Sequence, residues 1–90
     1  MMNVQMIVSG RVQGVGFRYS VRRKALGFGL VGWVKNNDDG TVRFEVEGNE
    51  QTIERFIQEI KTNLHALIRI DHIDVMKSTN QVGYQTFSIK

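Results

Sequence analysis

The stretch LVGWVKNNDDGTVRFEVEG, residues 30–48, predicts a β-hairpin at the centre of the fold. Glycine at Asp39-Gly40 supplies the positive backbone φ that tight hairpin turns need. In the second strand apolar residues alternate with charged ones, so one set faces the core, namely Val42, Phe44 and Val46. The other set is expected to face solvent, namely Arg43, Glu45 and Glu47. We therefore expect an antiparallel sheet built outward from this hairpin.

A strand and a helix are expected on the N-terminal side of the hairpin. Apolar residues alternate with polar ones at Val4, Met6 and Val8. Apolar residues then recur every four positions at Phe17, Val21 and Ala25. These patterns predict a strand and then a short amphipathic helix over residues 17–26, which Gly27 ends. The last turn of this helix is basic, at Arg22, Arg23 and Lys24. Cations there complement the helix dipole, so we expect these residues to be structural or solvent-facing.

A second helix and two strands are expected on the C-terminal side of the hairpin. Asn49 is a suitable N-cap, and the apolar residues after it recur at helical spacing: Ile53, Phe56, Ile57, Ile60 and Leu64. This stripe is expected to be core. The apolar alternation then shifts phase between Ile70 and Ile73, which predicts an edge strand with a β-bulge near Asp71-His72. A last short strand is expected at Phe87 and Ile89.

The order of these elements indicates the fold class. Strand, helix, strand, strand, helix and strand in succession, with a short final strand, is the βαββαβ order of the split βαβ, ferredoxin-like arrangement. We therefore expect an α+β sandwich in which two helices pack on one face of an antiparallel sheet. Ninety residues are about 0.6 of a typical domain, so we expect a single domain over residues 1–90.

The composition excludes several classes of protein. The chain has no cysteine, which excludes disulfides, a thiolate nucleophile and a Cys-based zinc site, and fits a reducing compartment. The longest apolar run is three residues, and the first ten residues lack the pattern of a secretory signal. No apolar stripe is left over that would demand a partner. We therefore expect a cytoplasmic monomer that does not bind membranes.

The charges are unevenly distributed, although the net charge is only +3. Residues 1–37 contain no acidic residue and six basic ones: Arg11, Arg18, Arg22, Arg23, Lys24 and Lys35. All nine acidic residues follow, between residues 38 and 74. A wholly basic first third predicts an anion site there, although chance and the basic end of the first helix would also produce the pattern.

Two polar residues depart from the structural pattern. Arg18 follows the glycine-rich loop GRVQGVG, residues 10–16, and lies in the first turn of the helix, where the dipole disfavours a cation by about 0.3–1 kcal/mol. Main-chain N–H groups of such a loop together with a guanidinium can hold a phosphate. Asn36 ends an otherwise apolar or small strand face. Taken alone, Arg18 could equally extend into solvent, and Asn36 could serve only the turn.

Two segments resemble the acylphosphatase family: SGRVQGVGFR, residues 9–18, and GLVGWVKNNDDGTV, residues 29–42. The resemblance extends over nearly the whole chain in order and length. It implies hydrolysis of the anhydride between a carboxylic acid and phosphate, with a small-molecule acyl phosphate as substrate and no metal or organic cofactor. It implies that Arg18 binds the phosphoryl group, that Asn36 positions the attacking water, and that the backbone of the preceding loop cradles the phosphate, at Gly14, Val15, Gly16, Phe17 and Arg18.

Two departures from the family pattern affect neither Arg18 nor Asn36. Lys35 stands where an arginine is common, and TNLHALIRI lacks the glycine-proline turn often seen after the second helix. Because of the second departure, the resemblance does not predict the geometry of the loop over residues 62–68.

Other functions fit the sequence less well. An RNA-binding module shares this element order, but its stacking aromatics belong on the central strands, where this chain has Glu45 and Glu47. GFGLVG, residues 27–32, matches the dinucleotide fingerprint but follows a predicted helix and precedes a predicted strand, the reverse of what that site needs. We also considered a regulatory or fused module without turnover, which retention of both Arg18 and Asn36 argues against, as does a free chain of 90 residues.

The remaining candidate side chains predict structure rather than chemistry. His65 and His72 lie in different elements without further ligands, so we expect no metal site. We expect Trp33 to be a core or sheet-face aromatic.

Overall fold

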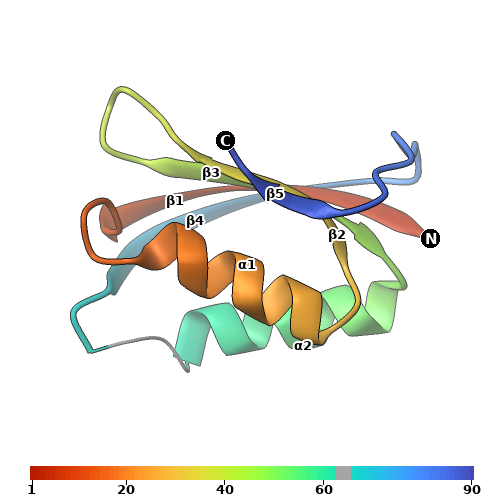
Figure 1. Cartoon of the computed structure of the whole chain (residues 1–90), viewed down its shortest axis with the longest axis horizontal. Coiled ribbons are helices and arrows are strands. Elements are labelled where there is room, and N and C mark those ends of the chain that lie inside the picture. Colours follow the sequence, from red (N-terminus) through yellow and green to blue (C-terminus); the bar gives the residue numbers. More distant parts are fainter. Residues whose placement is uncertain (63–65) are drawn as a thin grey trace.

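The computed structural model describes residues 1–62 and 66–90. Its elements follow the expected order: β1 (Met2–Arg11), α1 (Phe17–Gly27), β2 (Val31–Asn36), β3 (Val42–Gly48), α2 (Glu50–Thr62), β4 (Arg69–Ser78) and β5 (Phe87–Ile89). The two helices lie side by side against one face of a single sheet (Figure 1). The α+β ferredoxin-like class predicted from the sequence is therefore confirmed.

The sheet has the strand order β4-β1-β3-β2-β5. The four longer strands pair antiparallel, as expected from the hairpin. β5 instead pairs parallel to β2, with Gly32 opposite Phe87, so the sheet is mixed rather than wholly antiparallel. The reason is topological, because the chain leaves β4 at one edge and crosses to the far edge before it forms β5.

The predicted β-bulge lies in β4, at the edge of the sheet. Ser9 of β1 pairs with His72, whereas the next residue, Gly10, pairs with Ile70. Asp71 is therefore left without a partner in β1, at the position where the apolar alternation changes phase.

The helices begin and end close to the predicted positions. Asn49 caps α2, since its Oδ1 accepts a hydrogen bond from the backbone N–H of Gln51 at 2.9 Å. The apolar stripe of α2 is buried as far as Ile60, and Leu64 lies outside the described residues. In the residues that are described, no helix is long and apolar enough to cross a membrane.

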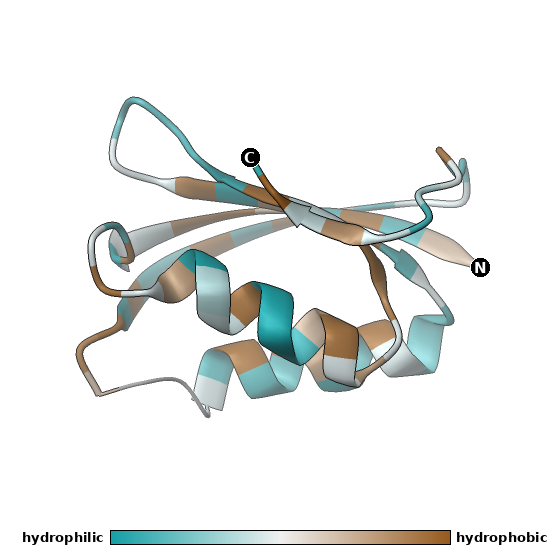
Figure 2. Ribbon diagram, viewed as in Figure 1, coloured by the Kyte–Doolittle hydropathy of each residue, from teal (hydrophilic) through white to brown (hydrophobic). Residues whose placement is uncertain are grey.

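The core lies between the helix layer and the sheet. Three phenylalanines from α1, β3 and α2 form a chain of edge-to-face contacts, with ring centroids 6.2 Å apart for Phe17 and Phe44 and 6.0 Å apart for Phe44 and Phe56. Figure 2 shows hydrophobic bands alternating with polar ones along the strands, as a sheet with two different faces requires. The core therefore holds the N-terminal end of α1 against the central strands.

Part of the face of the sheet away from the helices is closed to solvent, contrary to expectation, although Arg43 on the same face is half-buried. Glu45 and Glu47 are only 4% and 2% exposed. The expectation failed because the segment that crosses from β4 to β5 lies over these side chains, and the backbone N–H groups of Val82, Gly83 and Tyr84 donate to the Glu47 carboxylate. Tyr84 also donates its hydroxyl to Glu45 at 2.6 Å.

Asn3 of β1 completes this buried polar network. Its amide donates to Glu47 Oε2 at 2.8 Å and to Glu45 Oε2 at 3.0 Å. Trp33, a sheet-face aromatic as predicted, donates its indole N–H to the Tyr84 hydroxyl at 2.9 Å. The charged residues of β3 thus hold the crossing segment in place rather than contacting water.

Glu47 is ionised in this network. Burial alone would raise the pKa of its carboxyl. The hydrogen bonds from the Asn3 amide and from the backbone N–H groups of residues 82–84 outweigh the effect of burial and lower the pKa below its ordinary value. A carboxyl whose pKa is lower in the folded state stabilises the fold above the unfolded-state pKa of about 4.3. This stabilisation is lost as the pH falls through the folded-state pKa.

We expect Glu47→Ala to lower the free energy of unfolding by about 2–4 kcal/mol at pH 7, because three backbone N–H groups and Asn3 lose their acceptor. The loss should shrink as the pH is lowered below about 4. Urea unfolding followed by circular dichroism measures both values. Glu54→Ala is the matched control, since its ion pair with Lys77 is exposed and should contribute less than about 1 kcal/mol. Equal losses at pH 7 in the two variants would contradict the assignment.

Candidate active site

A cavity of about 180 Å³ opens where the N-terminal end of α1 meets the C-terminal end of β2. Its lining comes from the glycine-rich loop, the first turn of α1 and the last residue of β2: Val12, Gly14, Gly16, Phe17, Arg18, Tyr19 and Asn36. The structure therefore brings together the two polar residues that depart from the sequence pattern, Arg18 and Asn36. Among the residues that the structure describes, no carboxylate or histidine lines this cavity.

The loop presents its main chain to the cavity because of its glycines. Gly14 and Gly16 have φ of 75° and 80°, in the left-handed region where other residues are strained. Gly16 is the N-cap of α1 and has no side chain to cap it, so no side-chain hydrogen bond satisfies the first-turn N–H groups of this helix. Free N–H groups and the positive end of the helix dipole point to the same place, which makes the helix start suitable for an anion.

Arg18 adds a positive charge at this position. In the described part of the chain no Asp or Glu side chain pairs with its guanidinium, and its one hydrogen bond goes from Nη1 to the main-chain oxygen of Lys90 at 3.4 Å, near the long limit for such a bond. A guanidinium without a counter-ion beside a helix N-terminus is electrostatically unfavourable until an anion binds. The arrangement therefore favours a bound phosphate or carboxylate.

Asn36 lies opposite this positive end of the helix. It is the last residue of β2 and pairs with Val42, the first residue of β3. Its side-chain Oδ1 is buried, and within residues 1–62 and 66–90 it has no hydrogen-bond partner. Buried polar atoms are nearly always hydrogen-bonded, so an unpartnered amide at the cavity is a site for a polar ligand.

The cavity differs from the sequence prediction at several residues. Val15 belongs to the loop but does not line the cavity, whereas Gly14, Gly16 and Phe17 do. Val12 and Tyr19 line it and were not predicted. Tyr19 is 70% exposed and so is not part of the apolar core. Its place at the cavity could be recognised only after the start of α1 was known. Val12 could not be told from an ordinary core valine.

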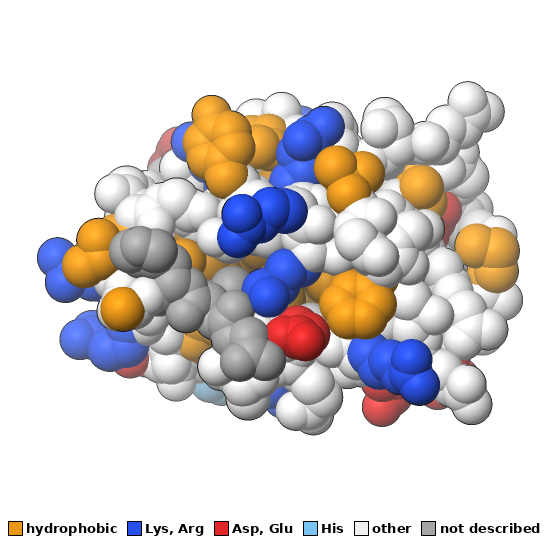
Figure 3. Space-filling view, turned by 60° about the horizontal axis from the view of Figure 1, so that its bottom comes forward, with side chains coloured by type: hydrophobic (Ala, Val, Ile, Leu, Met, Phe, Trp, Pro, Cys, Tyr) orange, Lys and Arg blue, Asp and Glu red, His pale blue; other side chains and the backbone are white. Residues whose placement is uncertain are grey.

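The basic residues at the end of α1 are structural or solvent-facing, as predicted, and Arg23 is exposed. Arg22 donates from Nε to the Phe87 carbonyl at 3.1 Å and so holds β5 against the helix. Lys24 forms an ion pair with Glu59 of α2 at 3.5 Å. Figure 3 shows several Lys and Arg side chains spread across the helix side of the molecule. Of the basic residues that the structure describes, Arg18 is the one that lines the cavity.

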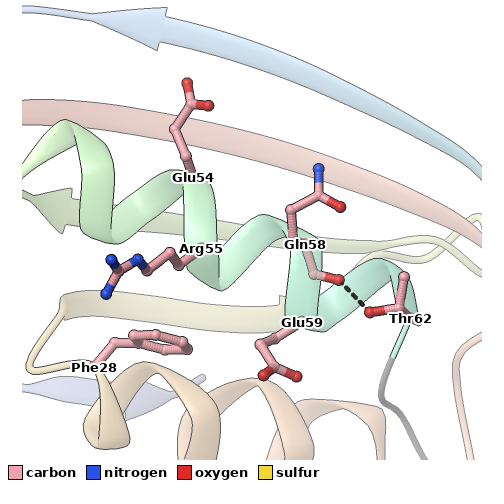
Figure 4. A pocket seen from close by; sticks show the side chains of 6 residues that line it. All are labelled: Phe28, Glu54, Arg55, Gln58, Glu59 and Thr62. Carbon is pink, nitrogen blue, oxygen red and sulfur yellow. Dashed lines mark hydrogen bonds between the residues drawn. The ribbon is translucent and has the colours of Figure 1, made fainter.

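A second hollow, of about 470 Å³, lies along α2 on the helix side. Figure 4 shows the Phe28 ring next to α2, with the Arg55 and Glu59 side chains near the ring. Two carboxylates, Glu54 and Glu59, line this hollow beside one cation, Arg55, and the glycine-rich loop does not reach it. It does not suit an anion, so the cavity at Arg18 is the candidate active site.

His72 does not line the candidate site. His72 hydrogen-bonds Asp74 at 2.9 Å on the exposed edge strand, and His65 lies outside the described residues. GFGLVG follows α1 and leads into β2, an order that does not fit dinucleotide binding.

Comparison with known proteins gives one consistent result. A family model described as Acylphosphatase matches residues 4–89. A relative named acylphosphatase from Geobacillus kaustophilus is 52% identical over 75 residues, which cover 82% of this chain and 80% of the relative. The crystal structure of acylphosphatase from Bacillus subtilis has a TM-score of 0.96 and 42% identity, and the match covers 100% of this chain and 99% of that one.

The same fold also occurs inside a longer protein. Full-length HypF, solved in a phosphate- and nucleotide-bound form, has a TM-score of 0.90 and 41% identity to this chain. The match covers 100% of this chain but 12% of HypF.

Arg18 should be costly to stability when no anion is bound. We expect Arg18→Ala to leave the fold intact and to raise the free energy of unfolding by about 0.3–1 kcal/mol at low ionic strength, because an unpaired cation is removed from the positive end of α1. Urea unfolding in a buffer free of phosphate and sulfate measures this. A marked loss of stability would show that Arg18 has a structural role instead.

Proposed function

Because the chain belongs to the acylphosphatase family and hydrolyses acyl phosphates, we propose that Arg18 and the loop before it hold the phosphoryl group while Asn36 positions the attacking water. The observation that carries this assignment is the meeting of both side chains in one cavity at an uncapped helix start.

The phosphoryl group is held by charge and by main-chain donors. The planar fork of the Arg18 guanidinium donates to two phosphoryl oxygens. We propose that backbone N–H groups of residues 14–18 surround the third oxygen, at the positive end of α1; of these residues Gly14, Gly16, Phe17 and Arg18 line the cavity. Both sets of donors are in place before substrate binds, so they stabilise the charge that spreads over these oxygens in the transition state.

Asn36 acts on water by orientation rather than by proton transfer. An amide takes no proton at neutral pH, but its buried, unpartnered Oδ1 accepts a hydrogen bond from a water opposite the leaving group. Holding that water in line with the P–O bond removes much of the entropic cost of the attack.

The reaction balances without a further catalytic side chain. The water oxygen forms a bond to phosphorus, the bond between phosphorus and the acyl oxygen breaks, and its electron pair leaves with the carboxylate. Since no carboxylate or histidine in residues 1–62 and 66–90 lines the cavity, we propose that an oxygen of the phosphoryl group accepts the proton of the water. A carboxylate with a conjugate-acid pKa near 4 leaves without protonation, whereas the alkoxide of an ordinary phosphate ester does not, so such esters should be poor substrates.

An RNA-binding role is not supported by the arrangement of the sheet. Glu45 and Glu47 were expected on an open face, which is wrong, since both are buried. The outer face is nevertheless unsuited to base stacking, because residues 82–84 lie over β3 and the Trp33 ring is 8% exposed. We expect no nucleic-acid partner.

The same proposal extends to the setting of the enzyme. We propose one acylphosphatase domain over residues 1–90, acting as a cytoplasmic monomer on a small-molecule substrate. The absence of cysteine supports a reducing compartment. The exposed large apolar residues are scattered over several elements rather than gathered on one face, which supports a monomer: Met1, Tyr19, Leu26, Leu67, Val75, Met76 and Val82.

Substitution of the two side chains should separate their roles. We expect Arg18→Ala to lower kcat/KM for benzoyl phosphate by 10² or more and to weaken competitive inhibition by inorganic phosphate in parallel. Asn36→Ala should lower kcat by about 10²-fold with little change in that inhibition constant. Benzoate release, followed by ultraviolet absorbance with and without added phosphate, gives the kinetic constants and the inhibition constant of phosphate. Loss of phosphate affinity in Asn36→Ala, with kcat retained, would mean that the roles are reversed.

The chemistry should need no added metal. We expect full hydrolysis of benzoyl phosphate in excess EDTA, because the guanidinium and main-chain N–H groups supply the charge stabilisation. Turnover measured before and after chelation is the test, with a magnesium-restored sample as the control. Activity that disappears with EDTA and returns with magnesium would refute the proposal.

A further inference from the structure

Gln13 connects the two sides of the proposed site without lining the cavity. Its Nε2 donates to the backbone carbonyl of Asn37 at 2.8 Å and to that of Thr41 at 2.9 Å. Both hydrogens of the amide are therefore used. Gln13 immediately precedes Gly14 of the cradle, and Asn37 immediately follows Asn36.

The turn that receives these bonds is itself braced. The Asn37 N–H donates to the Thr41 carbonyl at 2.8 Å, and the Asn37 side chain donates to the Thr41 hydroxyl at 2.9 Å. That hydroxyl donates in turn to Asp39 at 2.6 Å. The turn over residues 37–41 thus behaves as one unit, and Gln13 is attached to it at two points.

The two Gln13 bonds are the direct link between the glycine-rich loop and the turn that follows β2. In the described residues, the two Gln13 bonds are the hydrogen bonds that join the loop over residues 12–16 to the end of β2 and its turn. The loop is otherwise fixed to α1, through the hydrogen bond from the Ser20 N–H to the Gly16 carbonyl at 3.1 Å. The cradle and Asn36 therefore lie on different segments, which share the sheet and the core and are joined directly by the two Gln13 bonds.

We propose that Gln13 is a positioning residue that sets the location of Asn36 relative to the phosphoryl cradle. The inference rests on the proposed function of Arg18 and Asn36. In-line attack tolerates little displacement of the water, and a shift of about 1 Å can reduce a rate by about 10²-fold. Releasing Gln13 leaves the cradle intact, because its N–H groups and Arg18 belong to the loop and α1. Only the alignment of water with phosphorus changes.

A double-mutant cycle tests this. We expect Gln13→Ala to lower kcat for benzoyl phosphate by 10- to 100-fold, with less than about a twofold change in the inhibition constant of inorganic phosphate. In the Asn36→Ala background the same substitution should change kcat less than about twofold, because there is no longer an amide to position. Losses that multiply in the double variant, an unchanged kcat in Gln13→Ala, or a parallel loss of phosphate affinity would each overturn the proposal.

A charge variant of the same size provides a second test that does not depend on deleting the side chain. In Gln13→Glu, an ionised carboxylate would face two carbonyl oxygens and donate to neither, whereas the protonated form donates to one. The ratio of its kcat to that of the unmodified enzyme should therefore rise as the pH falls from 7 to 5. A ratio that stays constant over this range would contradict the role assigned to the donor.

Controls distinguish this inference from the function on which it rests. Gln58→Ala removes an exposed glutamine of α2 far along the chain from the site and should match the unmodified enzyme. Phosphate inhibition and thermal unfolding confirm that each variant is folded. If Asn36→Ala itself leaves kcat unchanged, the proposed function fails; if Asn36→Ala behaves as expected and Gln13→Ala does not, only the inference fails.

Discussion

The candidate site depends on one electrostatic constraint: α1 begins without a side-chain cap. A helix usually satisfies its first N–H groups with a serine, threonine, aspartate or asparagine side chain. Here Gly16 takes that place with a positive φ, and Arg18 adds a cation where the dipole disfavours one. The end of the helix is therefore incomplete without an external anion. The fold stabilises this arrangement by burying Phe17, the first residue of α1, against Phe44 of the central strand.

The core and the segment that crosses from β4 to β5 together determine where Asn36 lies. β2 occupies an inner position, between β3 and β5, so its last residue is fixed by neighbours on both sides. β5 in turn is held by Arg22, and the segment that leads into it is held at residues 82–84 by Glu45 and Glu47. The carboxylates on the outer face thus support the strand layer from which Asn36 projects, although neither approaches the cavity.

Local patterns predicted most of the fold, because periodicity and capping act over a few residues. Local patterns predicted three features in this way: the bulge at Asp71, the Asn49 cap and the buried stripe of α2. The burial of Glu47 was not predicted, since its partners at residues 82–84 are 35–37 positions away and are main-chain groups that any residue would supply. Arg18 and Asn36 stood out because each breaks a local rule. Gln13 breaks none, and only the three-dimensional arrangement shows its two bonds.

The bulge has a consequence for behaviour in a crowded solution. β4 is a ten-residue edge strand with one side open, and such an edge is a template on which other chains can add as further strands. The unpaired Asp71 interrupts its regular spacing of donors and acceptors, and the edge carries charged side chains at Arg69, Asp71, Asp74 and Lys77. The irregularity that shifts the register by one residue therefore also protects the folded molecule against growth into fibrils.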